Sequence, residues 1–159
     1  MARAVGRLAV VVTLVAVMGA SALSVTPRVR PCTIDGTPAD DILRGTPGPD
    51  VICGHGGDDR IHGREGHDIL LGGPGDDWVR AGSGRDLLVG GGGWDYLKGS
   101  RGVDRLAGGT GTDCLWAYDG RSERVAGGRG VDYGFVDEAA DRVRGVEHVG
   151  RVCRVRSIE

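Results

Sequence analysis

Residues 36–116 read as nine consecutive nonapeptides: GTPADDILR, GTPGPDVIC, GHGGDDRIH, GREGHDILL, GGPGDDWVR, AGSGRDLLV, GGGGWDYLK, GSRGVDRLA and GGTGTDCLW. The first and fourth positions are each Gly in eight copies. The sixth position is always Asp, at Asp41, Asp50, Asp59, Asp68, Asp77, Asp86, Asp95, Asp104 and Asp113. The eighth is always aliphatic, at Leu43, Ile52, Ile61, Leu70, Val79, Leu88, Leu97, Leu106 and Leu115. Four columns that hold over nine consecutive copies, with one exception each in the first and fourth, are not explained by glycine-rich composition, so the repeat decides the fold.

Each column suggests a physical role. Glycine adopts backbone angles closed to other residues, and the eighth residue of each copy can point inward as a single core column. Short carboxylates dominate the charge, since 17 of the 22 acidic residues are Asp. Calcium is a hard cation that takes about six to eight oxygen ligands, which Asp carboxylates and loop carbonyls can supply.

The pattern matches the nonapeptide G-G-x-G-x-D-x-U-x, and over residues 36–116 the chain resembles the RTX, or hemolysin-type, calcium-binding repeat proteins. The resemblance implies an all-β fold, a right-handed parallel β-roll solenoid. In such a roll the first six residues of a nonapeptide form a loop and the last three form a strand. Two nonapeptides make one turn, and each Ca²⁺ would lie between the loops of repeats n and n+2.

The resemblance also implies the ligands. One edge would carry Asp41, Asp59, Asp77, Asp95 and Asp113, and the other Asp50, Asp68, Asp86 and Asp104, which allows at most seven complete sites. The implied backbone ligands are Gly73, Gly75, Gly82, Gly84, Gly91, Gly93, Gly102, Gly109 and Gly111. Thr37, Thr46, His55, Arg64 and Ser100 replace the second-position Gly, so the sites between Gly72 and Asp113 are expected to be the best formed. Fifth-position Asp40, Asp58 and Asp76 are expected to be solvated charges, with a supporting acceptor role as the alternative.

The repeat weakens after Trp116. Ala117 shifts the frame by one residue, and 118–135 continue as two degenerate copies, YDGRSERVA and GGRGVDYGF. Glu123 and Asp132 take the sixth position there, but Gly134 occupies the core position, so Asp132 is expected to be a marginal ligand. Residues 23–35 are a lead-in, 36–135 the roll and 136–159 a C-terminal cap, which a solenoid needs over its last core layer.

The N-terminus is typical of a bacterial export signal. Arg3 and Arg7 precede an apolar run from Leu8 to Met18, and Ala20-Ser21-Ala22 predicts cleavage after Ala22, so 1–22 are a signal peptide. An uncleaved anchor is the alternative, but the run is shorter than the ~20 residues that span a bilayer. The mature chain is therefore expected to be secreted, with no membrane span. Its net charge of 18 − 22 = −4 argues against nucleic acid as a partner.

Four cysteines in an exported chain allow three pairings. Local pairing of Cys32 with Cys53, and of Cys114 with Cys153, would pin the two ends of the roll. The alternative is a metal site formed by Cys53 with His55 and His62, whose spacing fits no usual zinc pattern.

No H-E-x-x-H helix, G-K-[ST] phosphate loop or G-x-S-x-G elbow is present, so the chain is not expected to be an enzyme. The expected function is calcium binding that drives folding of the roll. Two alternatives remain: an extracellular adhesive or matrix module using exposed Trp78, Tyr96 and Trp116, and an accessory domain of a separate enzyme.

Overall fold

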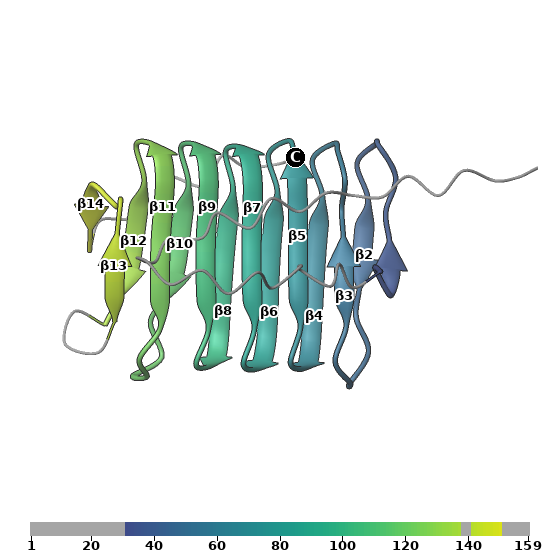
Figure 1. Cartoon of the computed structure of the whole chain (residues 1–159), viewed down its shortest axis with the longest axis horizontal. Coiled ribbons are helices and arrows are strands. Elements are labelled where there is room, and N and C mark those ends of the chain that lie inside the picture. The colour runs from purple at the N-terminus through teal and green to yellow at the C-terminus, as the bar shows by residue number, and fades with distance from the viewer. Residues whose placement is uncertain (1–30, 138–140, 151–159) are drawn as a thin grey trace, which may run out of the picture. The chain divides into compact units, whose positions relative to one another are not determined.

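The computed structural model describes residues 31–137 and 141–150, which form two parallel seven-stranded sheets without any helix. Sheet A contains, in order, β1 (Ile34–Asp35), β3 (Val51–Cys53), β5 (Ile69–Pro74), β7 (Leu87–Gly93), β9 (Arg105–Gly111), β11 (Arg124–Gly130) and β13 (Arg142–Arg144). Sheet B contains, in order, β14 (His148–Val149), β12 (Tyr133–Val136), β10 (Cys114–Ala117), β8 (Tyr96–Gly102), β6 (Trp78–Gly84), β4 (Arg60–Gly66) and β2 (Ile42–Arg44). Figure 1 shows that consecutive strands alternate between the sheets, with turns at both edges.

The strand register follows the nonapeptide. Val79 pairs with Leu97 in sheet B, and Leu88 pairs with Leu106 in sheet A, so each step between paired strands spans two nonapeptides. Two nonapeptides therefore make one turn, and equivalent positions of repeats n and n+2 lie beside one another. The expected all-β parallel roll is confirmed.

The core consists almost entirely of the eighth-position side chains. Ile52, Leu70, Leu88 and Leu106 come from sheet A, and Ile61, Val79, Leu97 and Leu115 come from sheet B; all are buried in one cluster. Each turn thus adds two sizeable apolar side chains to the interior. This is a thin core for the number of residues that it orders.

The strands are longer than the three residues that the resemblance implies. Strands β6 to β9 run from the seventh position of one nonapeptide to the fourth of the next, and only the fifth and sixth positions form the turn. Glycines make this possible: Gly73 pairs with Gly91 of the adjacent turn, both at positive φ (125° and 134°). Backbone pairing between turns therefore extends through the glycine segment.

The solenoid continues through the frame shift at Ala117. Leu106 pairs with Val125, which is one position more than two nonapeptides, so the register absorbs the extra residue. Strands β13 and β14 extend both sheets into the segment expected to be the cap. At Gly134, where the core lacks a side chain, a Cβ would lie 3.0 Å from Val146 Cγ1, because Val146 packs into this space. Within the described ranges, no helix is long and apolar enough to cross a membrane.

Candidate metal centres

The sixth-position aspartates form two columns, one along each edge of the roll. Those that precede sheet B strands are Asp41, Asp59, Asp77, Asp95 and Asp113, and those that precede sheet A strands are Asp50, Asp68, Asp86 and Asp104. We call these the sheet B column and the sheet A column. The two predicted sets of aspartates are thus each brought into one line.

Within a column, the backbone links each aspartate to the next. The N–H of Asp59 donates to Oδ1 of Asp77 at 2.9 Å, and the N–H of Asp77 donates to Oδ1 of Asp95 at 3.0 Å. The sheet A column repeats the pattern, with the N–H of Asp68 donating to Oδ1 of Asp86 at 2.8 Å. A charge-assisted bond of this kind fixes one carboxylate oxygen and the orientation of the side chain.

The second carboxylate oxygen is left without a hydrogen-bond donor. This holds for Oδ2 of Asp59, Asp68, Asp77, Asp86, Asp95, Asp113 and Asp132, all of which are buried. Asp95 is 0% exposed. A carboxylate taken out of water without a partner costs several kcal/mol, so something other than these protein groups is needed to compensate each charge.

Backbone carbonyls gather around the same oxygens. A Cβ on first-position Gly90 would lie 2.7 Å from Cγ of Asp95 and 2.7 Å from the carbonyl oxygen of Gly108, one turn later. On Gly72, a Cβ would lie 2.8 Å from Cγ of Asp77 and 2.7 Å from the carbonyl oxygen of Gly90. Carboxylate and carbonyl oxygens, which are all hydrogen-bond acceptors, therefore lie together around the position that a side chain at these glycines would occupy. A hard cation with oxygen ligands fits this donor set.

Burial acts on the protonation of these groups. It raises the pKa of Asp77 and of Asp113 to about 7, and that of Asp95 to about 8. The backbone N–H that each carboxylate accepts lowers its pKa, but only in part, and neighbouring carboxylates raise it further. The fold alone therefore disfavours the charged carboxylates that calcium would need.

The second position is occupied by a residue other than glycine in five of the nine regular repeats. His55, Arg64 and Ser100 keep a positive φ of 79°, 83° and 77°, so the backbone conformation of the second position is kept without glycine. A non-glycine residue in this region costs about 1–2 kcal/mol.

Thr37 and Thr46 behave differently. The N–H of Thr37 donates to Oδ2 of Asp41 at 2.6 Å, and the N–H of Thr46 donates to Oδ2 of Asp50 at 2.7 Å. The Thr hydroxyls contact the same oxygens. In these two repeats Oδ2, which has no donor in most of the other repeats, already accepts hydrogen bonds. This supports weaker cation binding at the N-terminal end of the roll.

Two further sets of acidic residues join this arrangement. Asp132 extends the sheet B column, because its Oδ1 accepts the N–H of Asp113 at 2.9 Å and its side chain is fully buried. It therefore resembles the regular aspartates more closely than its degenerate repeat suggested. The fifth-position residues Asp40 and Asp58 are exposed, but each accepts the backbone N–H of the fifth residue one turn later.

The cysteines near the N-terminal end are bonded to each other. Cys32 and Cys53 form a disulfide with a Cα–Cα distance of 6.0 Å, as expected. This removes the thiolates from the alternative metal site, and His55 instead contacts Asp35 at 2.6 Å. Cys114 is disulfide-bonded, and its expected partner, Cys153, lies outside the described residues, so that pairing stays a prediction.

The sheets, the aspartate columns and the glycine loops together define a parallel β-roll of nonapeptide repeats. Four copies of the RTX calcium-binding nonapeptide repeat match the chain, at residues 35–70, 71–106, 89–123 and 98–134. Because the matches span well over half of the 159 residues, the chain belongs to this family, whose repeats bind Ca²⁺. Neither a curated protein nor a solved structure matches it.

Proposed function

We propose that this is a secreted calcium-binding protein in which Ca²⁺, held between the turns of the roll, drives folding. The single observation that carries the proposal is the row of buried Oδ2 atoms without donors, such as those of Asp77 and Asp95. These carboxylates oppose folding when charged and unpaired. A cation that neutralises them converts its binding free energy into folding free energy.

The thin core supports the same proposal. Two large apolar side chains per turn, such as Leu88 and Leu97, offset only part of an ordering cost of about 1–2 kcal/mol per residue. Carboxylates on neighbouring turns also repel each other across roughly the 4.8 Å strand spacing. A Ca²⁺ ion bound between the turns replaces this repulsion with attraction between the ion and the carboxylates.

Equilibrium dialysis against Ca²⁺ tests the binding. The purified chain is compared with an Asp77→Asn/Asp95→Asn variant and with an Asp40→Asn/Asp58→Asn control that removes the same charge from exposed fifth positions. The first variant is expected to bind fewer ions than the control. Equal binding by the two variants would show that the sheet B column does not supply the ligands.

Export is supported by the N-terminal signal pattern and is in keeping with the Cys32–Cys53 disulfide, since disulfides persist in oxidising compartments. N-terminal sequencing of the mature protein from the medium is expected to begin at Leu23. Recovery of the uncleaved chain from membranes would overturn this part of the proposal. The proposed role is structural and binding rather than enzymatic, because the matched repeats form a calcium-binding module.

An adhesive role is the second candidate, favoured by one feature of sheet B. Its outer face carries five of the seven aromatic residues, Trp78, Tyr96, Trp116, Tyr133 and Phe135. Trp78 is 39% exposed and contacts Tyr96 edge to face, and Trp116 stacks on Phe135. A Trp78→Ala variant that loses binding to a surface while keeping its calcium response would favour this role.

A further inference from the structure

The frame shift at Ala117 changes the turn that follows it. Between β8 and β9 the turn contains only Val103 and Asp104, whereas residues 118–123 connect β10 to β11. This longer connection brings two acidic side chains, Asp119 and Glu123, to the sheet A edge of the roll. Neither belongs to the nine regular repeats.

Three carboxylates converge at this turn. Oxygen atoms of Asp119, Glu123 and Asp137 all lie within 4.8 Å of one another. Asp119 and Asp137 occupy the second position of the nonapeptide frame, where none of the nine regular repeats has an acidic residue. Side-chain carboxylates thus stand where the regular repeats have none.

Backbone donors hold two of these carboxylates in place. The N–H of Gly102 donates to Oδ2 of Asp119 at 2.9 Å. The N–H groups of Asp119 and Gly120 both donate to Oδ2 of Asp137, at 3.0 and 2.6 Å. Backbone hydrogen bonds therefore fix the positions of the Asp119 and Asp137 carboxylates in this turn.

Glu123 has no such support. Its side chain is only 2% exposed, and neither of its carboxylate oxygens has a hydrogen-bond donor. Burial, followed by the neighbouring carboxylates of Asp141 and Asp119, raises the pKa of Glu123. A buried carboxylate that faces other carboxylates is costly unless a cation or a proton lies between them.

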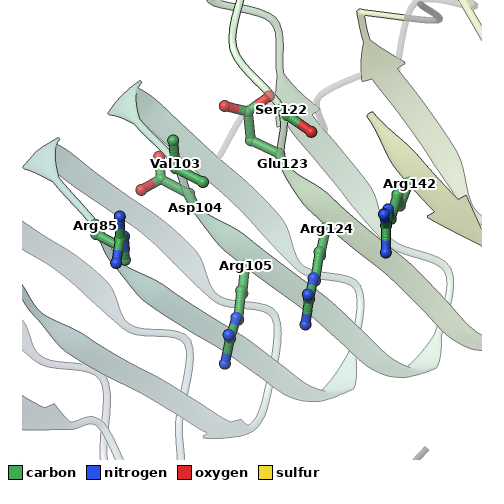
Figure 2. Close-up of a pocket in the computed structure, with 8 residues that line it drawn as sticks. All are labelled: Arg85, Val103, Asp104, Arg105, Ser122, Glu123, Arg124 and Arg142. Atoms are coloured by element: carbon green, nitrogen blue, oxygen red, sulfur yellow. The ribbon is translucent and has the colours of Figure 1, made fainter. Parts of the chain in front are cut away.

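The nearby arginines do not supply that cation. Figure 2 shows Arg105, Arg124 and Arg142 side by side, with their guanidinium groups directed away from the carboxylate of Glu123. Among the described residues, the only arginine ion pair is between Arg121 and Asp119, at 3.8 Å, and the Arg121 side chain is 61% exposed. The charge on Glu123 is thus not neutralised by a protein group.

We propose that Asp119, Glu123 and Asp137 bind a calcium ion at the C-terminal end of the sheet A column, which Glu123 extends, through second-position carboxylates that the regular repeats lack. The ligands are carboxylate oxygens alone, which suits a hard divalent cation such as Ca²⁺. The ion joins the β10–β11 connection to the residue that follows β12, one turn further along. It therefore closes the C-terminal end of the roll, where the repeats have lost their regularity.

The test counts bound Ca²⁺ per chain by equilibrium dialysis with the purified protein. Glu123→Gln is expected to bind one ion fewer than the wild type. The matched control is Glu65→Gln, which makes the same change on an exposed side chain of β4 and is expected to leave the count unchanged. Circular dichroism in calcium confirms that each variant is folded.

An unchanged count in a folded Glu123→Gln variant would overturn the proposal and indicate that Glu123 shares a proton with its neighbours. If Glu123→Gln does not fold, Asp119→Asn is measured instead, because Asp119 is half-buried. This variant is expected to bind one ion fewer than the wild type, and an unchanged count would contradict the proposal. Because Glu123 takes the sixth position, Asp119→Asn, which changes only a second position, separates this site from the regular sites of the sheet A column. A wild type that binds a single ion, lost in Glu123→Gln, would uphold this site and overturn the columns.

Discussion

The backbone N–H of Asp77 donates to Oδ1 of Asp95 at 3.0 Å, while Oδ2 of Asp95 is buried without a donor. The same side chain thus has one oxygen that holds two turns together and one oxygen that the protein leaves unsatisfied. One oxygen of each carboxylate therefore has a structural role, the other is the proposed calcium ligand, and mutation can separate the two.

An Asp77→Asn/Asp95→Asn variant keeps the acceptor oxygen and replaces the orphaned oxygen with an NH₂ group. That group can donate to the neighbouring carbonyl oxygens, such as that of Gly90 near Asp77. The calcium-free variant is therefore expected to be more stable than the calcium-free wild type, by roughly 1–3 kcal/mol per site. Its stabilisation by calcium is expected to shrink.

Far-UV circular dichroism in chelator compares the folded fractions of the variant and the wild type, and urea unfolding in calcium measures the stabilisation by calcium. A variant that is less stable than the wild type in chelator, yet gains as much from calcium, would show that Oδ2 of these residues is not a ligand. The Asp40→Asn/Asp58→Asn variant serves as the control, because those side chains are exposed.

Stability without calcium should depend on pH. Burial raises the pKa of Asp77 to about 7 and that of Asp95 to about 8, above their ordinary value. Because the folded-state pKa is raised, protonation of these carboxyls favours the folded roll. Their favourable contribution is complete below the unfolded pKa of about 4, and it is lost as the pH rises through about 7 to 8.

The calcium-free chain is therefore expected to be folded and to show a thermal transition at about pH 5, but to have lost most of its β signal at about pH 8, where the gain from calcium is expected to be larger. Thermal unfolding of metal-stripped protein at both pH values checks this. A calcium-free melting temperature that is higher at the alkaline value would contradict the assignment of uncompensated buried carboxylates.

The glycine at the second position is expected to be hard to replace. Gly91 has a φ of 134°, and an added Cβ would lie 2.8 Å from the carbonyl carbon of Gly73. Gly120 also has a positive φ, of 80°, but an added Cβ would meet nothing within 4 Å. We expect Gly91→Ala to cost roughly 2–4 kcal/mol and Gly120→Ala about 1 kcal/mol. Similar unfolding free energies in calcium would argue against this close stacking of the turns.

The Cys32–Cys53 disulfide pins β1 to the roll across a sequence separation of 21 residues. Replacing both cysteines with serine is expected to lower the unfolding free energy by about 3 kcal/mol, mainly because the unfolded chain gains entropy. Urea unfolding in saturating calcium measures this. A loss below the error of the measurement would mean that the first turn does not share in the cooperative unfolding.

The nonapeptide spacing sufficed to predict the aspartate columns and the core column, because a fixed period of two nonapeptides per turn places equivalent residues side by side. It did not predict which oxygen of each carboxylate is satisfied. Nor did it show that Thr37 and Thr46 donate to that oxygen in the first two repeats, since this depends on local backbone angles.

The cluster around Glu123 was also missed. It forms because the connection that follows the frame shift at Ala117 is longer than the regular turns, and because Asp119 and Glu123 of the first degenerate copy meet Asp137, which lies in the segment expected to be the cap. The available signal was the pair of second-position aspartates, Asp119 and Asp137, which lie two nonapeptides apart in the shifted frame.

The most direct test of calcium-driven folding is far-UV circular dichroism of residues 23–159, recorded in excess chelator and then during titration with calcium. The chain is expected to lack most of its β signal in chelator at about pH 8, and to gain it cooperatively as calcium fills the columns. A full β signal in chelator, with a melting temperature that millimolar calcium does not change, would contradict the central claim.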